Sequence, residues 1–155
     1  MKRVFHYTTA DRLIAILEAG EIRPATAGVQ PPEIPAVWLS TAPDWEHTAT
    51  KGIIENGTRR SATLGEMIQS CGSVARIQVN PDKVGMIYPV KLREKLRMKK
   101  AVLQSIINAA KAMGGNPAEW LAVAGPIPAD AFLKIELSKE CGPLRWVDVE
   151  ELNEA

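Results

Sequence analysis

Three short stretches of this chain carry side chains that could do chemistry, and they lie far apart in the sequence. His6 lies in an apolar stretch near the start, Ser40 and Thr41 follow the apolar run 37–39, and Glu119 precedes another apolar run. A histidine can hydrogen-bond a ligand, and a carboxylate can stabilise the positive charge that develops when a glycosidic bond breaks. In this order, the three groups could bind a dinucleotide and act on a glycosidic bond.

The hydropathy pattern predicts the first elements that must carry these side chains. Residues 3–7 are expected to form a strand, and Thr8 or Thr9 supplies an N-cap hydroxyl to a helix over 10–19. Gly20 is a natural end for that helix. The helix is expected to bury one face, which is formed by Leu13, Ile14, Ile16 and Leu17.

The remaining pattern predicts an α+β fold. Residues 24–36 read as a loop because of their prolines, and 36–39 as a short strand. Further helices are predicted over 45–54, 61–70 and 91–113, strands over 74–79, 86–90, 119–123 and 132–137, a turn at 56–57, and a short strand or turn in the acidic tail 146–155. No Gly-rich phosphate loop follows any strand, so we expect a mixed, mainly antiparallel sheet with flanking helices rather than a doubly wound one.

Composition indicates an ordinary globular protein. The 155 residues are expected to form one domain over 1–155, with 46% hydrophobic residues, 24% charged residues and a net charge of +1. No apolar run is long enough for a membrane span, and the basic start does not continue as a signal peptide. Cys71 and Cys141 are too few for a disulfide framework or a zinc site. The expected location is the cytoplasm, with no metal and no membrane contact.

Three motifs resemble those of the ADP-ribosyltransferase-like superfamily. The run His6-Tyr7-Thr8-Thr9, with the helix after it and its Ile-Leu-x-x-Gly-x-Ile ending over 16–22, is similar to the opening of such proteins. Residues 37–41 look like the second motif strand. Residues 117–128, in which Glu119 opens a strand that runs into Gly-Pro-Ile-Pro, look like the third. The resemblance follows the chain in order and implies a split sheet of the ADP-ribosyltransferase type.

The resemblance also implies a reaction. These proteins cleave NAD⁺ between nicotinamide and ribose, so NAD is the implied substrate and the chain would be a transferase that passes ADP-ribose to a nucleic acid or protein acceptor. Glu119 takes the place of the catalytic carboxylate, and His6 that of the group that anchors the adenosine ribose. Ser40 and Thr41 take the place of residues that frame the nicotinamide pocket. The reaction needs no metal.

The neighbours of these residues complete the expected NAD site. Tyr7 and Thr8 flank His6 on the first strand, and Trp38 is either a wall of the pocket or part of the core. Alternation along a strand should aim Tyr7 away from His6 unless the strand end redirects it. Glu136, on a later strand, is the rival candidate for the catalytic carboxylate.

Two departures from the superfamily pattern leave alternatives open. Residues 37–70 contain no tyrosine to stack on nicotinamide, and Pro117 stands where enzymes that modify arginine have Glu or Gln. The alternative to an enzyme is therefore a catalytically inactive module that binds a nucleotide or a partner on the same fold. An effector or toxin-like protein could use either form.

A basic run suggests a second partner. Residues 91–100 contain six Lys or Arg and one Glu, and on a helix Arg93, Arg97 and Lys100 would share one side. These three could contact nucleic-acid phosphates, and the cations at 47–60 could extend that face. The alternative is an ordinary solvated helix face.

Overall fold

The computed structural model describes residues 2–153, which form an α+β fold around one seven-stranded sheet. Every strand pairing within residues 2–153 is antiparallel, so the α+β class and the antiparallel pairing are confirmed, and the sheet there is not mixed. From edge to edge the strands are β11 (Val147–Asp148), β10 (Phe132–Ser138), β6 (Val74–Val79), β1 (Phe5–Thr9), β3 (Val37–Ser40), β8 (Trp120–Val123) and β7 (Met86–Ile87).

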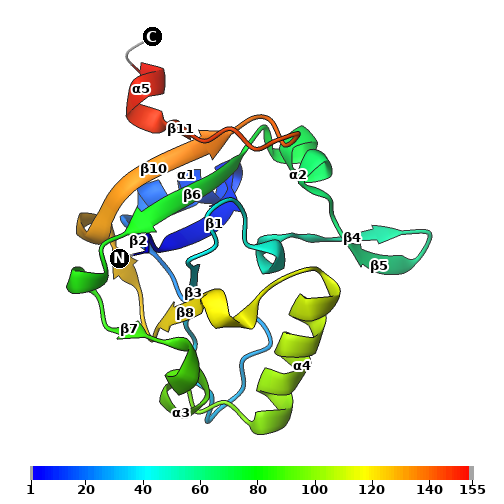
Figure 1. The fold of residues 1–155 in the computed structure, drawn as a ribbon, viewed down its shortest axis with the longest axis vertical. Coiled ribbons are helices and arrows are strands. Elements are labelled where there is room, and N and C mark those ends of the chain that lie inside the picture. Colours follow the sequence, from blue (N-terminus) through cyan, green and yellow to red (C-terminus); the bar gives the residue numbers. More distant parts are fainter. Residues whose placement is uncertain (1, 154–155) are drawn as a thin grey trace.

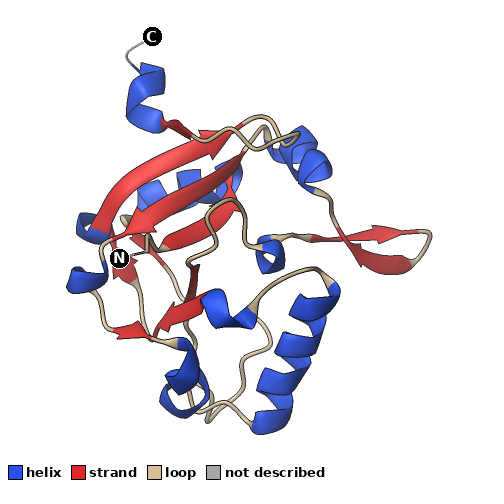
Figure 2. Ribbon diagram, viewed as in Figure 1, coloured by secondary structure: helices blue, strands red, loops and turns tan. Residues whose placement is uncertain are grey.

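Helices and short strands surround this sheet (Figures 1 and 2). The helices are α1 (Ala10–Ala19), α2 (Leu64–Cys71), α3 (Leu92–Lys95), α4 (Lys100–Ala112) and α5 (Val149–Asn153). β2 (Glu21–Ile22) pairs with β9 (Ile127–Pro128), and β4 (Gly52–Glu55) pairs with β5 (Thr58–Ser61) as a hairpin that projects from the body in Figure 1. The 3₁₀ turns are η1 (His47–Ala49), η2 (Pro81–Lys83), η3 (Pro89–Lys91), η4 (Pro117–Glu119) and η5 (Ala129–Ala131). Within residues 2–153, none of the helices combines the length and apolarity needed to cross a membrane.

The strands bury both of their faces because successive side chains point in opposite directions. Leu39 and Ile77 lie in the largest cluster together with Leu13 of α1, whereas Phe5 and Tyr7 lie in a second cluster on the other side with Met67 of α2. A third cluster fixes α3 and α4 beside β8 and contains Ala36, Leu92, Leu96, Met98, Ala110, Trp120 and Ala122. Burial of each large apolar side chain contributes roughly 1.5–3 kcal/mol.

The sheet is nearly split between β1 and β3. These two strands share one residue pair, Phe5 with Ser40, whereas β1 and β6 share five. Across the opening, the His6 ring is hydrogen-bonded to the Trp38 carbonyl, with 3.0 Å between Nδ1 and the oxygen. A side chain thus replaces the backbone ladder where the strands diverge.

The predicted helix over 45–54 is wrong. This segment contains η1, followed by β4, the first strand of the hairpin. Gly52 and the β-branched residues 53–54 favour a strand over a helix. The predicted turn at Asn56-Gly57 is confirmed, and both residues have positive φ (52° and 75°), as two-residue hairpin turns require.

The prediction of one helix over 91–113 is also wrong, because this segment forms two separate helices. α3 ends at Lys95, α4 begins at Lys100, and Arg97 between them has a left-handed φ of 53°. Leu96 and Met98 are 1% and 5% exposed. On one continuous helix, residues two positions apart point about 200° away from each other. The break between the helices therefore lets both Leu96 and Met98 enter the core. Arg93, Arg97 and Lys100 therefore do not share a helix face.

The predicted buried face of α1 is only half correct. Leu13 is buried and Ile16 partly so, but Ile14 and Leu17 are 58% and 50% exposed. The strand predicted over 3–7 spans Phe5–Thr9, the one over 86–90 stops at Ile87, and the helix predicted over 61–70 is α2 at Leu64–Cys71. The strands over 74–79, 119–123 and 132–137 are confirmed to within one residue at either end.

A candidate nucleotide cleft

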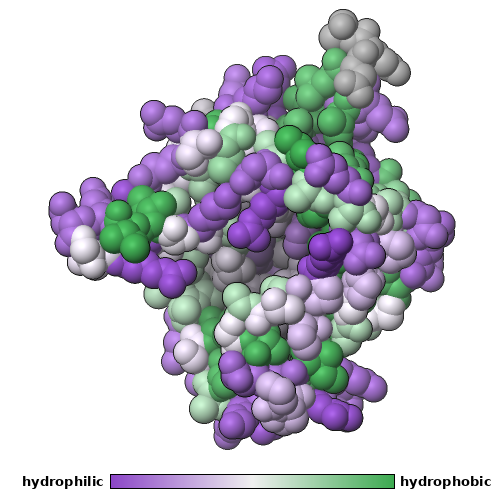
Figure 3. Space-filling model, turned by 180° about the vertical axis from the view of Figure 1, so that it is seen from behind, coloured by the Kyte–Doolittle hydropathy of each residue, from purple (hydrophilic) through white to green (hydrophobic). Residues whose placement is uncertain are grey.

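A cleft of about 680 Å³ opens where β1 and β3 diverge. Its volume lies within the range of about 300–1,000 Å³ typical of small-molecule sites. Figure 3 shows a hollow near the centre of the rear face, edged by hydrophilic side chains. The cleft is lined by Phe5, His6, Tyr7, Thr8, Thr9, Arg12, Trp38, Leu39, Ser40, Glu46, Thr48, Ala49, Thr50, Lys51, Gly52, Arg59, Ile106 and Trp120.

His6 presents a hydrogen-bond acceptor to the cleft. Burial lowers the pKa of its imidazole; the hydrogen bond to Trp38 works against this effect, and the nearby Arg12 charge adds to it. The lowered pKa favours the neutral ring, which carries one proton. Because the Trp38 carbonyl can only accept, the hydrogen bond assigns that proton to Nδ1. Nε2 is therefore left as an acceptor, suited to a ligand hydroxyl.

Stability should fall as His6 is forced to take up a proton. Its pKa is lower in the folded state, so the unfolded chain binds more protons below about pH 6.5, and folding weakens there. We expect the free energy of unfolding to drop between pH 6.5 and 5.5, with a slope of at most about 1.4 kcal/mol per pH unit. Urea unfolding of wild type and His6→Gln would measure this. Equal pH slopes for the two proteins would contradict the neutral assignment.

Glu46 provides a carboxylate in the wall of the cleft. Glu46 is 7% exposed. Its carboxylate oxygens accept hydrogen bonds from the Ser40 hydroxyl at 2.8 Å, the Thr48 amide at 3.1 Å and the Trp120 indole at 3.3 Å. The Thr48 hydroxyl donates a fourth. Three of these donors reach Oε2, and only the Ser40 hydroxyl reaches Oε1. Because each carboxylate oxygen has about two acceptor positions, Oε2 is fully occupied and Oε1 keeps one.

The segment before Glu46 is fixed by three side chains. Tyr7, Arg76 and Trp146 donate hydrogen bonds to the consecutive carbonyls of residues 42–44, with 2.7 Å for the Arg76 contact and 3.0 Å for the Trp146 contact. Three donors from three different strands or loops hold three successive peptide units. The carboxylate is therefore held in a preorganised position rather than on a free loop.

Three cations line the cleft near the hairpin. Arg12 comes from the first turn of α1, Lys51 precedes β4, and Arg59 lies on β5. The Arg59 guanidinium passes 2.8 Å from the position that a Cβ of residue 52 would occupy, so glycine at that position leaves room for it. Lys51 also pairs with Asp11 at 3.4 Å. Guanidinium and ammonium groups gathered in this way suit a phosphate-bearing ligand.

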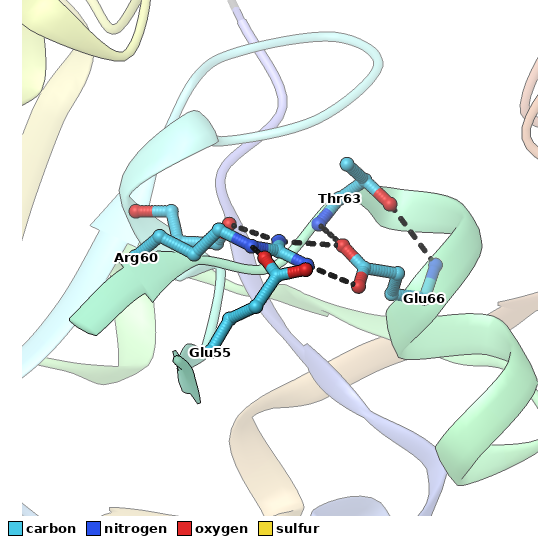
Figure 4. A network of polar contacts seen from close by, with 5 residues as sticks. Glu55, Arg60, Thr63 and Glu66 are labelled. Carbon is cyan, nitrogen blue, oxygen red and sulfur yellow. Dashed lines mark hydrogen bonds and ion pairs between the residues drawn. The ribbon is translucent and has the colours of Figure 1, made fainter. Parts of the chain in front are cut away.

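The hairpin that carries Arg59 is tied to α2 (Figure 4). Arg60 pairs with Glu55 across the hairpin and with Glu66 of α2 at 2.8 Å. Thr63 and Glu66 form a reciprocal capping box at the start of α2. Its hydrogen bonds with Arg60, and secondarily with Thr63, lower the pKa of Glu66 to about 2. The base of the hairpin is therefore oriented relative to the sheet.

The structure brings most of the predicted site residues together. His6, Tyr7, Thr8, Trp38 and Ser40 all line the cleft. The Tyr7 ring also packs edge-on against Trp45 at 5.3 Å, and burial raises the pKa of its hydroxyl to about 12. Its main role is therefore in the core, as strand alternation suggested.

Thr41 and Glu119 are not among the described residues that line the cleft. The Thr41 amide donates to the Glu119 backbone carbonyl at 3.0 Å, so the contact with Glu119 involves its main chain. Trp120 lines the cleft, but Glu119 is the last residue of the turn η4, just before β8 begins. Glu136, the rival, is also elsewhere, because its carboxylate pairs with Arg76 at 2.9 Å and both side chains are buried.

Sequence reasoning missed Glu46 and the cations Arg12, Lys51 and Arg59 as a group. The available signal was the polar run after the second strand, where Glu46 lies six residues beyond Ser40 and two before Thr48. Assignment of this run to a helix hid the possibility that both residues face one cavity.

Residues 2–153 contain no group of three or more His, Cys, Asp or Glu side chains placed to hold a metal ion. The groups that the cleft does offer are an acceptor imidazole, a buried carboxylate, aromatic walls and cations. No family model matches the chain, and no curated protein or solved structure was found to be similar to it, so its function must be argued from these residues.

Proposed function

We propose that this cleft binds NAD⁺ and transfers its ADP-ribose to an acceptor. The observation that carries the proposal is the convergence of His6, Glu46 and the cations Arg12, Lys51 and Arg59 on one cleft. A dinucleotide has ribose hydroxyls, a diphosphate and aromatic bases, and the cleft offers a complementary group for each of them.

The binding groups divide in a simple way. The His6 Nε2 accepts a hydrogen bond from a ribose hydroxyl, and the cations face the diphosphate. Trp38 and Trp120, which pack edge to face at 6.3 Å, offer apolar surface for a base. Thr8 and Ser40, which were also predicted to contact NAD and which line the cleft, remain part of the proposal as well.

In this proposal the carboxylate role belongs to Glu46 instead of Glu119. When the nicotinamide–ribose bond breaks, its electron pair leaves with the nicotinamide nitrogen and the ribose becomes an oxocarbenium ion. The Glu46 charge stabilises that ion, and the acceptor then adds at the ribose carbon and gives up its proton. Because Oε2 is fully occupied by Thr48 and Trp120 and Oε1 already accepts from Ser40, Glu46 acts mainly through its charge.

The hydrogen bonds that the protein itself gives to Glu46 favour a second candidate function. With three donors on Oε2 and one on Oε1, the carboxylate keeps only one acceptor position for a ribose hydroxyl or for orienting a nucleophile. The cleft would then serve a binding module that holds NAD⁺ or ADP-ribose without breaking the bond.

The test is a calorimetric titration of NAD⁺ followed by an assay for free nicotinamide. We expect saturable binding and nicotinamide release by wild type, and about tenfold weaker binding by His6→Gln, since one hydrogen bond to ligand is lost. His47→Gln is the matched control, because His47 is exposed and does not line the cleft. Binding without release would support the module, and absence of binding would overturn both candidates.

A further inference from the structure

The positive charge of the chain is concentrated in one segment. Residues 80–113 contain eight Lys or Arg and two Asp or Glu, a net charge of +6. The other residues contain eleven Lys or Arg and sixteen Asp or Glu, a net charge of −5. The near-neutral total therefore hides one strongly basic segment, and a concentration of positive charge on this scale attracts polyanions.

The structure places the cations of this segment in solvent. Lys91, Arg93, Lys95, Arg97, Lys99 and Lys100 are all exposed. Lys91 pairs with Glu94 at 3.2 Å, and no ion pair involves the other five within the part of the chain that is described. We call these six residues the basic surface.

The core holds the backbone of the basic surface in place. Leu92, Leu96 and Met98 are buried between the cations, and the Leu96 carbonyl accepts a hydrogen bond from the Ile34 amide at 2.8 Å. Arg97 keeps a left-handed backbone that a glycine would adopt at lower cost. The cations are therefore presented on a fixed loop, and an arginine occupies a position where local energetics favour glycine.

The electrostatics of this surface favour an anionic partner. Lys99 is the N-cap and Lys100 the first residue of the thirteen-residue helix α4, whose first turn contains no acidic residue. The helix dipole and the neighbouring cations both disfavour positive charge at this end. The free protein thus carries an unrelieved repulsion that bound phosphates would remove.

Exposed apolar side chains lie next to the basic surface in the chain. Tyr88 is 57% exposed and Val90 is 90% exposed, and Val90 lies in the turn η3 that leads into α3. An exposed aromatic ring beside cations is the combination that holds single strands, because every base can stack on it while the cations contact the backbone. A duplex hides its base faces and would use the cations alone.

We infer that the basic surface, together with Tyr88, binds single-stranded nucleic acid. The surface begins close to the cleft, because α4 carries Lys100 at its start and Ile106, which lines the cleft, six residues later. That separation is about 9 Å along the helix axis. The inference goes beyond the proposed function and does not require NAD⁺ to be bound or cleaved.

The test is fluorescence anisotropy with a labelled DNA strand of about 20 nucleotides, without NAD⁺, at several salt concentrations between about 50 and 200 mM. Compared with wild type, Arg93→Gln/Arg97→Gln/Lys100→Gln should bind at least about tenfold more weakly. Its plot of log affinity against log salt should lose about 2 from the slope, since each contact to a single strand contributes about 0.7. Tyr88→Ala should weaken binding about tenfold, and Tyr88→Phe should preserve it.

Matched controls separate this surface from charge in general. Lys2→Gln/Lys139→Gln/Arg145→Gln removes three exposed cations outside residues 80–113 and should stay within about twofold of wild type. Arg97→Gly removes a charge but relaxes the backbone, so it should bind more weakly while its melting temperature is unchanged or higher.

Three results would overturn the inference. The first is equal loss of binding in both triple variants, and the second is a basic-surface variant that still binds like wild type. The third is failure of the strand to bind while a polyglutamate peptide or phosphatidylserine vesicles do. No step of this test uses NAD⁺. If the protein does not bind the DNA strand, the proposal that the cleft binds NAD⁺ is unaffected. If the protein does not bind NAD⁺, the inference about nucleic acid is unaffected.

Discussion

Glu46→Gln should lower the rate of nicotinamide release from NAD⁺ by roughly 100- to 1,000-fold, whereas Glu119→Gln should leave it within about twofold. The first change removes the negative charge in the wall of the cleft while nearly preserving shape. The second changes a side chain that does not line the cleft, and it keeps the backbone carbonyl that Thr41 contacts. Steady-state release assayed by chromatography would measure both.

The comparison needs a check on folding, because Glu46→Gln would place an amide donor among the donors Ser40, Thr48 and Trp120. Urea unfolding should show a loss of about 1–3 kcal/mol for this mismatch, and ADP-ribose binding should persist. The reverse ranking, with Glu119→Gln inactive and Glu46→Gln active, would return the role to Glu119. Wild-type rates in both variants would show that neither carboxylate has a catalytic role.

Arg76→Met should destabilise the fold by about 3–5 kcal/mol. Arg76 lies opposite Glu136 in the β6–β10 pairing, and their side chains are 4% and 6% exposed. The guanidinium also lies 4.2 Å from the Phe5 ring and 4.5 Å from the Trp146 ring. Removing the cation leaves a buried carboxylate whose remaining cation, Lys134, is 3.9 Å away. Urea unfolding would give the free energy.

The double variant Arg76→Met/Glu136→Leu shows what the pair itself contributes. We expect it to be at least about 2 kcal/mol more stable than Arg76→Met, because no buried charge is left alone. It should still bind NAD⁺ more weakly than wild type, since the carbonyl contact that holds the segment before Glu46 is gone. Equal stability of the single and double variants would show that the rings and the carbonyl, rather than Glu136, account for the loss.

The sequence predicted the parts of the fold that local pattern controls. The strand over 74–79 alternates cleanly, and Asn56-Gly57 requires a turn, so both are confirmed. The helix over 91–113 failed because its apolar spacing is locally helical, and only the need to bury both Leu96 and Met98 breaks it. Contacts with distant residues decided that break, and a local pattern does not contain them.

The site was partly predictable for the same reason. His6 and Ser40 lie on strands, so their strand assignments placed them at one opening. Glu46 lies on an irregular segment whose course depends on donors at residues 7, 76 and 146. The position of its carboxylate follows from contacts that span 33 to 102 residues of chain, and no motif spacing encodes them.

The strand order has a consequence for how the chain folds during its synthesis. His6 faces Ile77 and Ser40 faces Trp120 in the pairings, so each closes a loop of roughly 70–80 residues. Such non-local topologies fold slowly because the entropy of loop closure is lost before contacts compensate for it. A nascent chain that has not yet added Trp120 lacks one wall of the cleft and a donor to Glu46. Any activity of this cleft is therefore withheld until Trp120 has been added, and fragments that end before it would be inert.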